Sequence, residues 1–187
     1  MPSHVALLRG INVGGVKLAM ADLRAVLSSL GYADVSTYIQ SGNALFSTPD
    51  TDNAKLAAAL ESAIEDRFGI WSSVVVLSRD ELARVLAANP YPDEPNPRLV
   101  HVVFLNAEPP GDLMTRISAA ESASAAKGSR DTVQAGGRVL FLHTPDGFGR
   151  SELAIQLARR AGPMSAKGAG TARNWATVTK LLQLCDS

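Results

Sequence analysis

Two glycine-rich runs near opposite ends of the chain carry the residue types that favour binding of an anion. The first, LRGINVGGVK, places three glycines between Arg9 and Lys17. Glycine has no Cβ atom, so the backbone beside it can approach a ligand closely and adopt angles that other residues avoid. We therefore expect Arg9, Lys17 and the backbone around Gly10, Gly14 and Gly15 to hold a negatively charged group.

The second run, KGAGTARN, supplies Thr171, Arg173 and Asn174 just before an amphipathic pattern. The pattern predicts a helix with Thr171 as its N-cap and Arg173 in its first turn. A cation there is unfavourable by up to about 1 kcal/mol, because the start of a helix carries partial positive charge. Arg173 therefore needs a partner, which is either a protein carboxylate or an external anion. If the two runs meet in space, they form one anion-binding site.

The first run does not match the established phosphate-binding motifs. In a P-loop the lysine directly follows a glycine, whereas Val16 separates Gly15 from Lys17 here. The hydroxyl residue that binds magnesium is also replaced, by Leu18, and the glycine spacing fails the dinucleotide-binding fingerprint. Asn12 suits either a ligand contact or a backbone hydrogen bond that shapes a tight strand-to-helix loop. The run is therefore a generic anion-binding loop or only a tight connection.

Ser41 and Asn43 are further polar candidates in the first half of the chain. Their side chains are suited to a ligand contact, but Ser-Gly-Asn is first of all a sequence that favours a β-hairpin turn. We keep both interpretations, with Ser41 and Asn43 as secondary polar contacts if a ligand binds.

No pattern typical of a metal centre or of a catalytic nucleophile is present. His4, His101 and His143 fall on separate predicted strands, and no histidine or cysteine pair has the spacing of metal ligands. Cys185 lies on the apolar stripe of the last predicted helix, so we expect it in the core or at a frayed end. We therefore expect no metal, and the residues indicate neither a cofactor nor an enzymatic reaction.

Composition limits the classes of function. The chain has 187 residues, 46% of them hydrophobic, and a formal net charge of zero, which excludes a uniformly basic surface that coats nucleic acid. The charges are nevertheless uneven, because residues 50–94 carry nine acids and four bases while residues 149–187 carry six bases and two acids. The single cysteine cannot form an internal disulfide, and the first residues resemble no export signal. We therefore expect a cytoplasmic protein that does not bind membranes.

Hydrophobic periodicity and turn residues predict the order β-α-β-β-α-β in the first half of the chain. Gly31 and Gly69 end the two helical patterns, and Ser41-Gly42 joins the two middle strands as a hairpin. The predicted elements are strand 4–9, helix 20–30, strands 35–40 and 43–47, helix 56–68 and strand 71–77.

The same order recurs after a connecting segment. A capping box from Ser78 to Glu81 predicts a helix to about residue 88, and four prolines within residues 89–97 mark a linker. Ser151 is the predicted cap of the second helix of this half, and only residues 163–166 are available for a fourth strand. The other predicted elements are strand 99–106, helix 112–126, strands 131–135 and 138–143, and helix 151–160.

The repeated order predicts an α+β protein with two ferredoxin-like halves and a C-terminal helix. Each half is expected to be a four-stranded antiparallel sheet with two helices on one face. The predicted domains are a first half at residues 1–78, a connecting helix and linker at residues 79–97, and a second half at residues 98–187.

Four segments resemble a bacterial family known as domain of unknown function 1697. This resemblance implies a duplicated ferredoxin-like architecture and no established activity. Ala172 and Ala176 depart from the family pattern but leave every candidate residue in place. The matching segments are ALLRGINVGG at residues 6–15, Met20 with Leu23-Arg24, TYIQSGN at residues 37–43 with Phe46, and TARNWATV at residues 171–178.

Two functional hypotheses follow. The first is a protein, enzyme or not, that binds a small phosphate- or carboxylate-bearing ligand between the two glycine-rich runs. The second is a non-catalytic module that binds nucleic acid or protein through its basic C-terminal third. Zero net charge and an aromatic content of 5% disfavour the nucleic-acid version. The sequence does not predict the oligomeric state.

Overall fold

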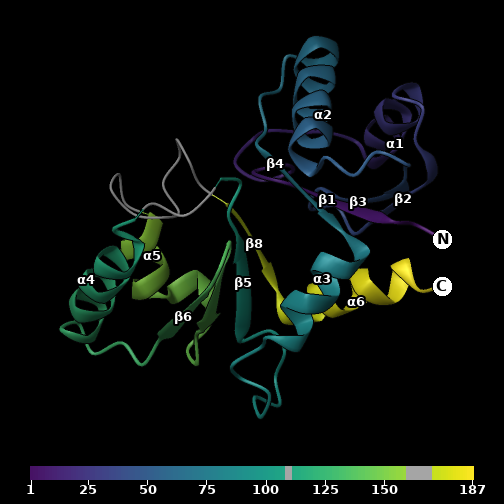
Figure 1. The fold of residues 1–187 in the computed structure, drawn as a ribbon. Coiled ribbons are helices and arrows are strands. Elements are labelled where there is room, and N and C mark those ends of the chain that lie inside the picture. Colours follow the sequence, from purple (N-terminus) through teal and green to yellow (C-terminus); the bar gives the residue numbers. More distant parts are fainter. Residues whose placement is uncertain (108–110, 159–169) are drawn as a thin grey trace. The chain divides into compact units, whose positions relative to one another are not determined.

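A computed structural model describes residues 1–107, 111–158 and 170–187 of the chain. It confirms the predicted α+β class, with two four-stranded antiparallel sheets, each with its own helices (Figure 1). The chain divides into two compact units, of which unit 1 comprises residues 1–84 and 179–187 and unit 2 comprises residues 85–178. The domain boundaries expected from the sequence stay a prediction. Within the described ranges, no helix has both the length and the apolar character needed to cross a membrane.

Unit 1 follows the predicted order of elements. Its sheet has the strand order β2-β3-β1-β4, so β1 pairs antiparallel with β3 on one side and with β4 on the other. Helix α2 ends where predicted, because Gly69 takes a left-handed backbone with a φ of 65°. The elements are β1 (His4–Leu8), α1 (Met20–Ser29), β2 (Ala33–Tyr38), β3 (Asn43–Ser47), α2 (Asn53–Phe68), β4 (Val74–Ser78) and α3 (Arg79–Ala87).

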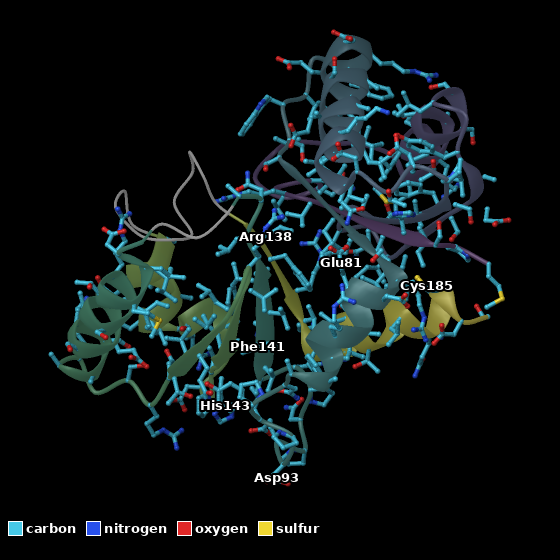
Figure 2. The ribbon with its side chains drawn as sticks, viewed as in Figure 1. Glu81, Asp93, Arg138, Phe141, His143 and Cys185 are labelled. Atoms are coloured by element: carbon cyan, nitrogen blue, oxygen red, sulfur yellow. The ribbon has the colours of Figure 1, made fainter. Side chains whose placement is uncertain are left out.

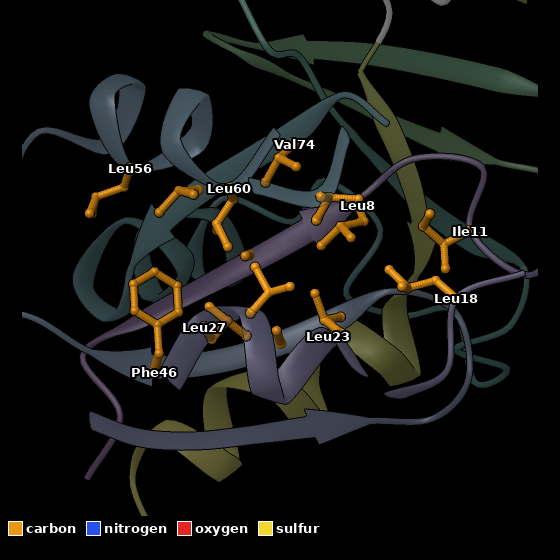
Figure 3. Close-up of a cluster of buried hydrophobic side chains, with 14 of the residues drawn as sticks. Leu8, Ile11, Leu18, Leu23, Leu27, Phe46, Leu56, Leu60 and Val74 are labelled. Carbon is orange, nitrogen blue, oxygen red and sulfur yellow. The ribbon is translucent and has the colours of Figure 1, made fainter. Parts of the chain in front are cut away.

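The core of unit 1 lies between its sheet and helices α1 and α2 (Figure 3). Alternate residues of β1, Ala6 and Leu8, face this core, as expected for a strand whose side chains alternate between faces. The glycine-rich connection after β1 also reaches the core, through Ile11 and Leu18, each only 2% exposed. Two buried side chains therefore fix this connection at both of its ends.

Gly42, in the turn between β2 and β3, is packed against the start of the same connection. Its φ is 72°, and a Cβ atom built there would lie 2.9 Å from the Cβ of Leu8 and 3.3 Å from the Cβ of Ile11. Its carbonyl oxygen also accepts a hydrogen bond from the backbone N–H of Leu8 at 2.8 Å. Glycine is therefore required here by backbone angle and by space.

We predict that Gly42→Ala lowers the free energy of unfolding by about 3 kcal/mol, the sum of a left-handed backbone penalty and overpacking. Gly69→Ala is the matched control, since Gly69 has a similar φ of 65° but no atom within 4 Å of a built Cβ. It should lower the free energy of unfolding by only about 1 kcal/mol. Urea unfolding measures both values, and equal losses would contradict the packing argument.

Unit 2 contains the second sheet, with the strand order β6-β7-β5-β8. Ser151 caps α5 as predicted, because its Oγ accepts a hydrogen bond from the N–H of Ala154 at 2.9 Å. The elements that begin in this unit are β5 (Val100–Phe104), α4 (Leu113–Ala125), β6 (Thr132–Gly136), β7 (Val139–His143), a 3-10 turn (Phe148–Arg150), α5 (Glu152–Ala158), β8 (Thr171–Asn174) and α6 (Trp175–Cys185). From residue 179 onward, α6 belongs to unit 1.

The end of the second glycine-rich run differs from the prediction. Thr171 and Arg173 belong to strand β8, which pairs antiparallel with β5, and α6 begins only at Trp175. The predicted N-cap at Thr171 and the predicted place of Arg173 in the first helical turn are therefore wrong. Asn174 is the cap instead, since its Oδ1 accepts a hydrogen bond from the N–H of Thr177 at 2.8 Å. The strand expected at residues 163–166 lies outside the described residues.

Candidate functional site

The connection between β1 and α1, which we call the glycine loop (residues 9–19), is exposed between two buried anchors. Ile11 and Leu18 are buried, whereas every residue from 12 to 17 is exposed. Gly14 and Gly15 have φ values of 59° and 92°, which glycine adopts without steric cost. The loop thus presents exposed backbone from a fixed base.

Asn12 shapes the glycine loop from within. Its φ is 59°, an angle that asparagine tolerates better than most residues. Its Nδ2 donates to the carbonyl oxygens of Leu18 at 3.0 Å and Gln40 at 2.7 Å, and its Oδ1 accepts from the N–H of Leu18 at 3.0 Å. Of the two roles expected for Asn12, the structure shows the backbone-bonding one, which closes the loop and ties it to the β2–β3 turn.

A pocket of about 420 Å³, which we call the loop pocket, opens at the glycine loop. Ala19, the N-cap of α1, is part of its lining. The backbone of Ala19 is extended, with a φ of −66° and a ψ of 141°, and its side chain has no oxygen that could cap the helix. The first amides of a helix have no partner inside the helix, so the start of α1 offers donors and partial positive charge. Lys17 adds a full positive charge to the same wall. The lining residues are residues 15–19, Asn12 and Gln40.

The expected part of Arg9, Gly10 and Gly14 in an anion site stays a prediction. The loop pocket is lined by Gly15 and Lys17, and its lining does not include Arg9, Gly10 or Gly14. The backbone of Arg9 joins the sheet, since its N–H donates to the carbonyl of Ser73 at 2.9 Å. Partial burial lowers the pKa of its guanidinium from the usual value.

Ser41 and Asn43 form the β2–β3 turn. Asn43 is fully buried, and its Nδ2 donates to the carbonyl of Tyr38 at 3.1 Å and to Oγ of Ser41 at 3.0 Å. The neighbouring Gln40 lines the loop pocket, whereas Ser41 and Asn43 do not. The turn interpretation therefore agrees with the geometry, and a ligand contact by these two residues stays a prediction.

Arg173 is a buried arginine of unit 2, only 8% exposed. Its Nη1 donates to Oγ1 of Thr171 at 2.5 Å and to the carbonyl oxygen of Ala172 at 2.9 Å. Burial lowers the pKa of its guanidinium to about 10, so the group remains charged at neutral pH. That the two glycine-rich runs form one site, with Thr171, Arg173 and Asn174 as contributors, stays a prediction, and residues 167–169 lie outside the described residues.

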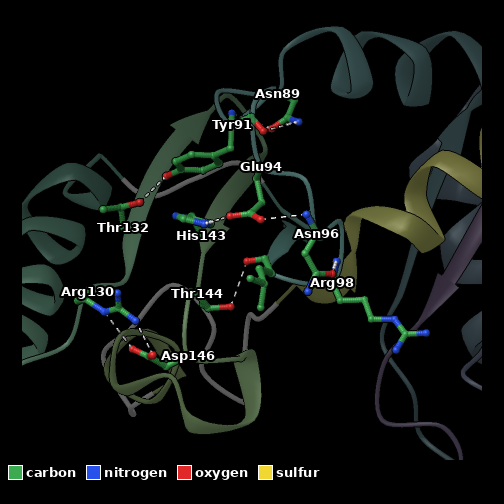
Figure 4. Close-up of polar contacts among 11 residues, drawn as sticks. Asn89, Tyr91, Glu94, Asn96, Arg98, Arg130, Thr132, His143, Thr144 and Asp146 are labelled. Carbon is green, nitrogen blue, oxygen red and sulfur yellow. Dashed lines mark hydrogen bonds and ion pairs between the residues drawn. The ribbon is translucent and has the colours of Figure 1, made fainter.

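Polar contacts in unit 2 attach the proline-rich segment to the β6–β7 hairpin (Figure 4). Nε2 of His143 lies 2.6 Å from a carboxylate oxygen of Glu94, and Oγ1 of Thr132 donates to the hydroxyl of Tyr91 at 3.0 Å. The ring centroids of Tyr91 and His143 are 5.2 Å apart. The backbone N–H of Asn96 also donates to Glu94, and this bond, together with His143, lowers the pKa of the Glu94 carboxyl. The segment is therefore held in place by side chains and is part of unit 2.

His101 on β5 is a half-buried histidine of this unit. Its ring stacks on Phe148 with centroids 4.1 Å apart, and its Nδ1 is buried with no hydrogen-bond partner among the described residues. Burial lowers the pKa of His101 to about 4, so the ring is neutral near pH 7. In the described ranges, no group of three or more His, Cys, Asp or Glu side chains is placed to hold a metal ion.

The sequence prediction missed Ala19 and Gln40 as parts of the site. A local signal for Ala19 existed, because Leu18-Ala19-Met20 contains none of the residues that usually cap a helix. No local signal existed for Gln40, because the turn that contains it lies beside the glycine loop only once β3 pairs with β1.

We predict that Asn12→Ala lowers the free energy of unfolding by about 2 kcal/mol, since three hydrogen bonds are lost. Asn12→Gly loses the same bonds but keeps a residue that accepts a positive φ, so its loss should be smaller. Hydrogen exchange at the amide of Leu18 should become faster in both variants. Unchanged exchange there would mean that Asn12 does not hold the loop closed.

We predict that His101 makes the protein less stable at acid pH. Its folded-state pKa of about 4 lies below the ordinary value of 6.5. Its stabilising contribution is therefore complete above about pH 6.5 and is lost as the pH falls towards 4, by up to roughly 3 kcal/mol. His101→Phe keeps a ring beside Phe148 but cannot be protonated. Between pH 7 and pH 4.5, the free energy of unfolding should fall less in His101→Phe than in the original protein. An equal fall in both proteins would contradict the prediction.

Comparison with known proteins identifies the family but no activity. A family model described as "Protein of unknown function (DUF1697)" matches residues 1–141, and the chain belongs to this family. Among solved structures, the chain is similar to "The structure of conserved bacterial protein SP0830 from Streptococcus pneumoniae", with a TM-score of 0.71 and 24% identity over 98% of both chains. At that identity the likeness supports the shared fold alone. No curated protein matches the chain.

Proposed function

We propose that this member of the DUF1697 family binds a small ligand through a phosphate or carboxylate group in the loop pocket. The observation that carries the proposal is that Ala19, the N-cap of α1 without a capping side chain, lines this pocket together with Lys17. Amide donors, the helix dipole and a lysine are together favourable for an anion. The fold itself does not select this function, because folds of this kind host many unrelated activities.

The pocket also limits what can bind. At about 420 Å³ it has the size of a small-molecule site rather than of a macromolecular groove. Val16 and Leu18 contribute apolar surface to its wall, so we expect the ligand to carry an organic part beside its anionic group, and pyrophosphate to bind as a probe of the anionic group alone. Asp22 lies in the first turn of α1 and partly offsets the positive charge there. We further propose that Thr171, Arg173 and Asn174 contribute to the same site. Anion binding in the loop pocket does not depend on this second proposal.

The test places a competing carboxylate at the helix start. In Ala19→Asp, the extended backbone of residue 19 suits an N-cap, so the new side chain should bind the first amides of α1 and raise the unfolding free energy by about 1 kcal/mol. The same carboxylate should weaken binding of pyrophosphate about tenfold or more. Binding is followed by NMR shifts of the amides of residues 15–22. A higher free energy of unfolding together with a weaker affinity for pyrophosphate would show that the loss of binding is not caused by unfolding.

Two further variants serve as controls. Lys17→Gln should weaken pyrophosphate binding, whereas Lys180→Gln, which removes one positive charge elsewhere, should not. Ala19→Asn caps the helix without adding charge and should give an intermediate affinity. If Ala19→Asp is stabilised and still binds pyrophosphate with the original affinity, the proposed function is wrong.

A further inference from the structure

A second pocket lies in unit 1 where the chain enters β1, and we call it the His4 pocket. Its volume is about 590 Å³, and it is distinct in its lining from the loop pocket, which follows the other end of β1. Figure 2 labels Glu81 on α3 and Cys185 near the end of α6, which both belong to its wall. The lining residues are residues 1–4 and 78–81, Thr48, Thr51, Asn53, Arg84, Cys185 and Asp186.

His4 provides a buried polar group in this wall. It is only 5% exposed, and its ring stacks on Phe46 with centroids 5.5 Å apart. Nδ1 lies 2.8 Å from Oγ of Ser3, whereas Nε2 has no hydrogen-bond partner among the described residues. Burial lowers the pKa of His4, and the nearby carboxylates of Glu81 and Asp50 only partly oppose this effect. The ring is therefore neutral at pH 7 and does not repel a cation.

Glu81 provides a carboxylate whose position is fixed by the fold. One of its oxygens, Oε2, accepts from Nδ2 of Asn53 at 2.5 Å and from the backbone N–H of Ser78 at 2.8 Å. The N–H of Glu81 in turn donates to Oγ of Ser78 at 3.2 Å, which completes the predicted capping box. Its other oxygen, Oε1, has no partner among the described residues.

The cations in the wall of the His4 pocket form ion pairs with carboxylates other than Glu81 or are exposed. Arg79 binds Asp186 through Nε at 2.8 Å and Nη2 at 3.2 Å, and it contacts Asp80 at 3.2 Å. Arg79 is therefore already engaged by two carboxylates. Two further cations of the lining are the exposed Arg84 and the N-terminal ammonium of Met1, which lies 3.3 Å from Asp34. With His4 neutral, the charges of the lining therefore balance, and Glu81 is a carboxylate of this lining that forms no ion pair with the described residues.

We propose that the His4 pocket binds the primary ammonium group of a small organic cation. The ammonium has only donors, and the wall of the pocket supplies an acceptor at Oε1 of Glu81, to which no described residue donates. Nε2 of His4 is a further acceptor in the tautomer that carries its proton on Nδ1. Met1, Pro2 and the buried thiol of Cys185 contribute surface for an aliphatic stem. The proposal is independent of anion binding in the loop pocket.

The test uses two probes with the same stem and opposite charge, n-butylammonium and butyrate, on the full chain. Glu81→Gln removes the negative charge, yet glutamine also satisfies a capping box, so the variant should fold. We expect n-butylammonium to shift the NMR signals of the His4 ring nitrogens and of residues 78–81, and butyrate to leave them unchanged. Glu81→Gln should weaken n-butylammonium binding roughly tenfold. Glu65→Gln, at an exposed carboxylate of α2, is the matched control and should bind as the original protein does.

Three outcomes overturn the proposal. They are the absence of n-butylammonium shifts at these residues, equal or stronger binding of butyrate, and equal affinities of Glu81→Gln and Glu65→Gln. Unfolding curves of both variants show whether any loss of binding follows from loss of structure. Pyrophosphate shifts at residues 15–22 are recorded in the same samples, so failure of the His4 pocket is distinguished from failure of the loop pocket.

Discussion

The backbone pairing of β1 is the constraint on which the rest of unit 1 depends. This strand forms antiparallel hydrogen bonds with β3 on one side and β4 on the other, and all five of its side chains are buried. A strand that is buried on both faces and bonded on both edges cannot shift its register without exposing apolar side chains. The chain segments that enter and leave β1 are therefore held in place by the most rigid element of the unit.

Both proposed pockets derive from this placement. At the start of β1, His4 is paired with Ser78 of β4, and Ser78 begins the capping box that positions Glu81. After the end of β1, Gly42 closes against Leu8, and Asn12 ties the glycine loop to the turn beside it. We propose an ammonium ligand for the first pocket and an anionic ligand for the second. A single strand thus positions the residues on which both proposals rest.

Unit 2 repeats the topology with different chemistry. Its central strand β5 pairs with β7 and β8, as β1 pairs with β3 and β4. In place of an open glycine loop, it contains a neutral, half-buried His101, a charged, buried Arg173 and a proline-rich segment held by Glu94 and His143. These groups are partly or fully buried or hydrogen-bonded, so we expect their substitution to lower the stability of the fold. The corresponding strand orders of the two sheets therefore do not imply a common function.

The sequence by itself determined the order of elements, because side-chain periodicity, glycine stops and caps act over a few residues. It identified the hairpin at Ser41-Gly42, the capping box at Ser78 and the exposed glycine loop. Only the tertiary structure decided that Thr171 to Asn174 form an edge strand instead of a helix start, since pairing with β5 outweighs local helical preference. It also decided which polar atoms face a pocket. Those atoms come from segments far apart in the chain, and their hydrogen-bond partners exist only after folding.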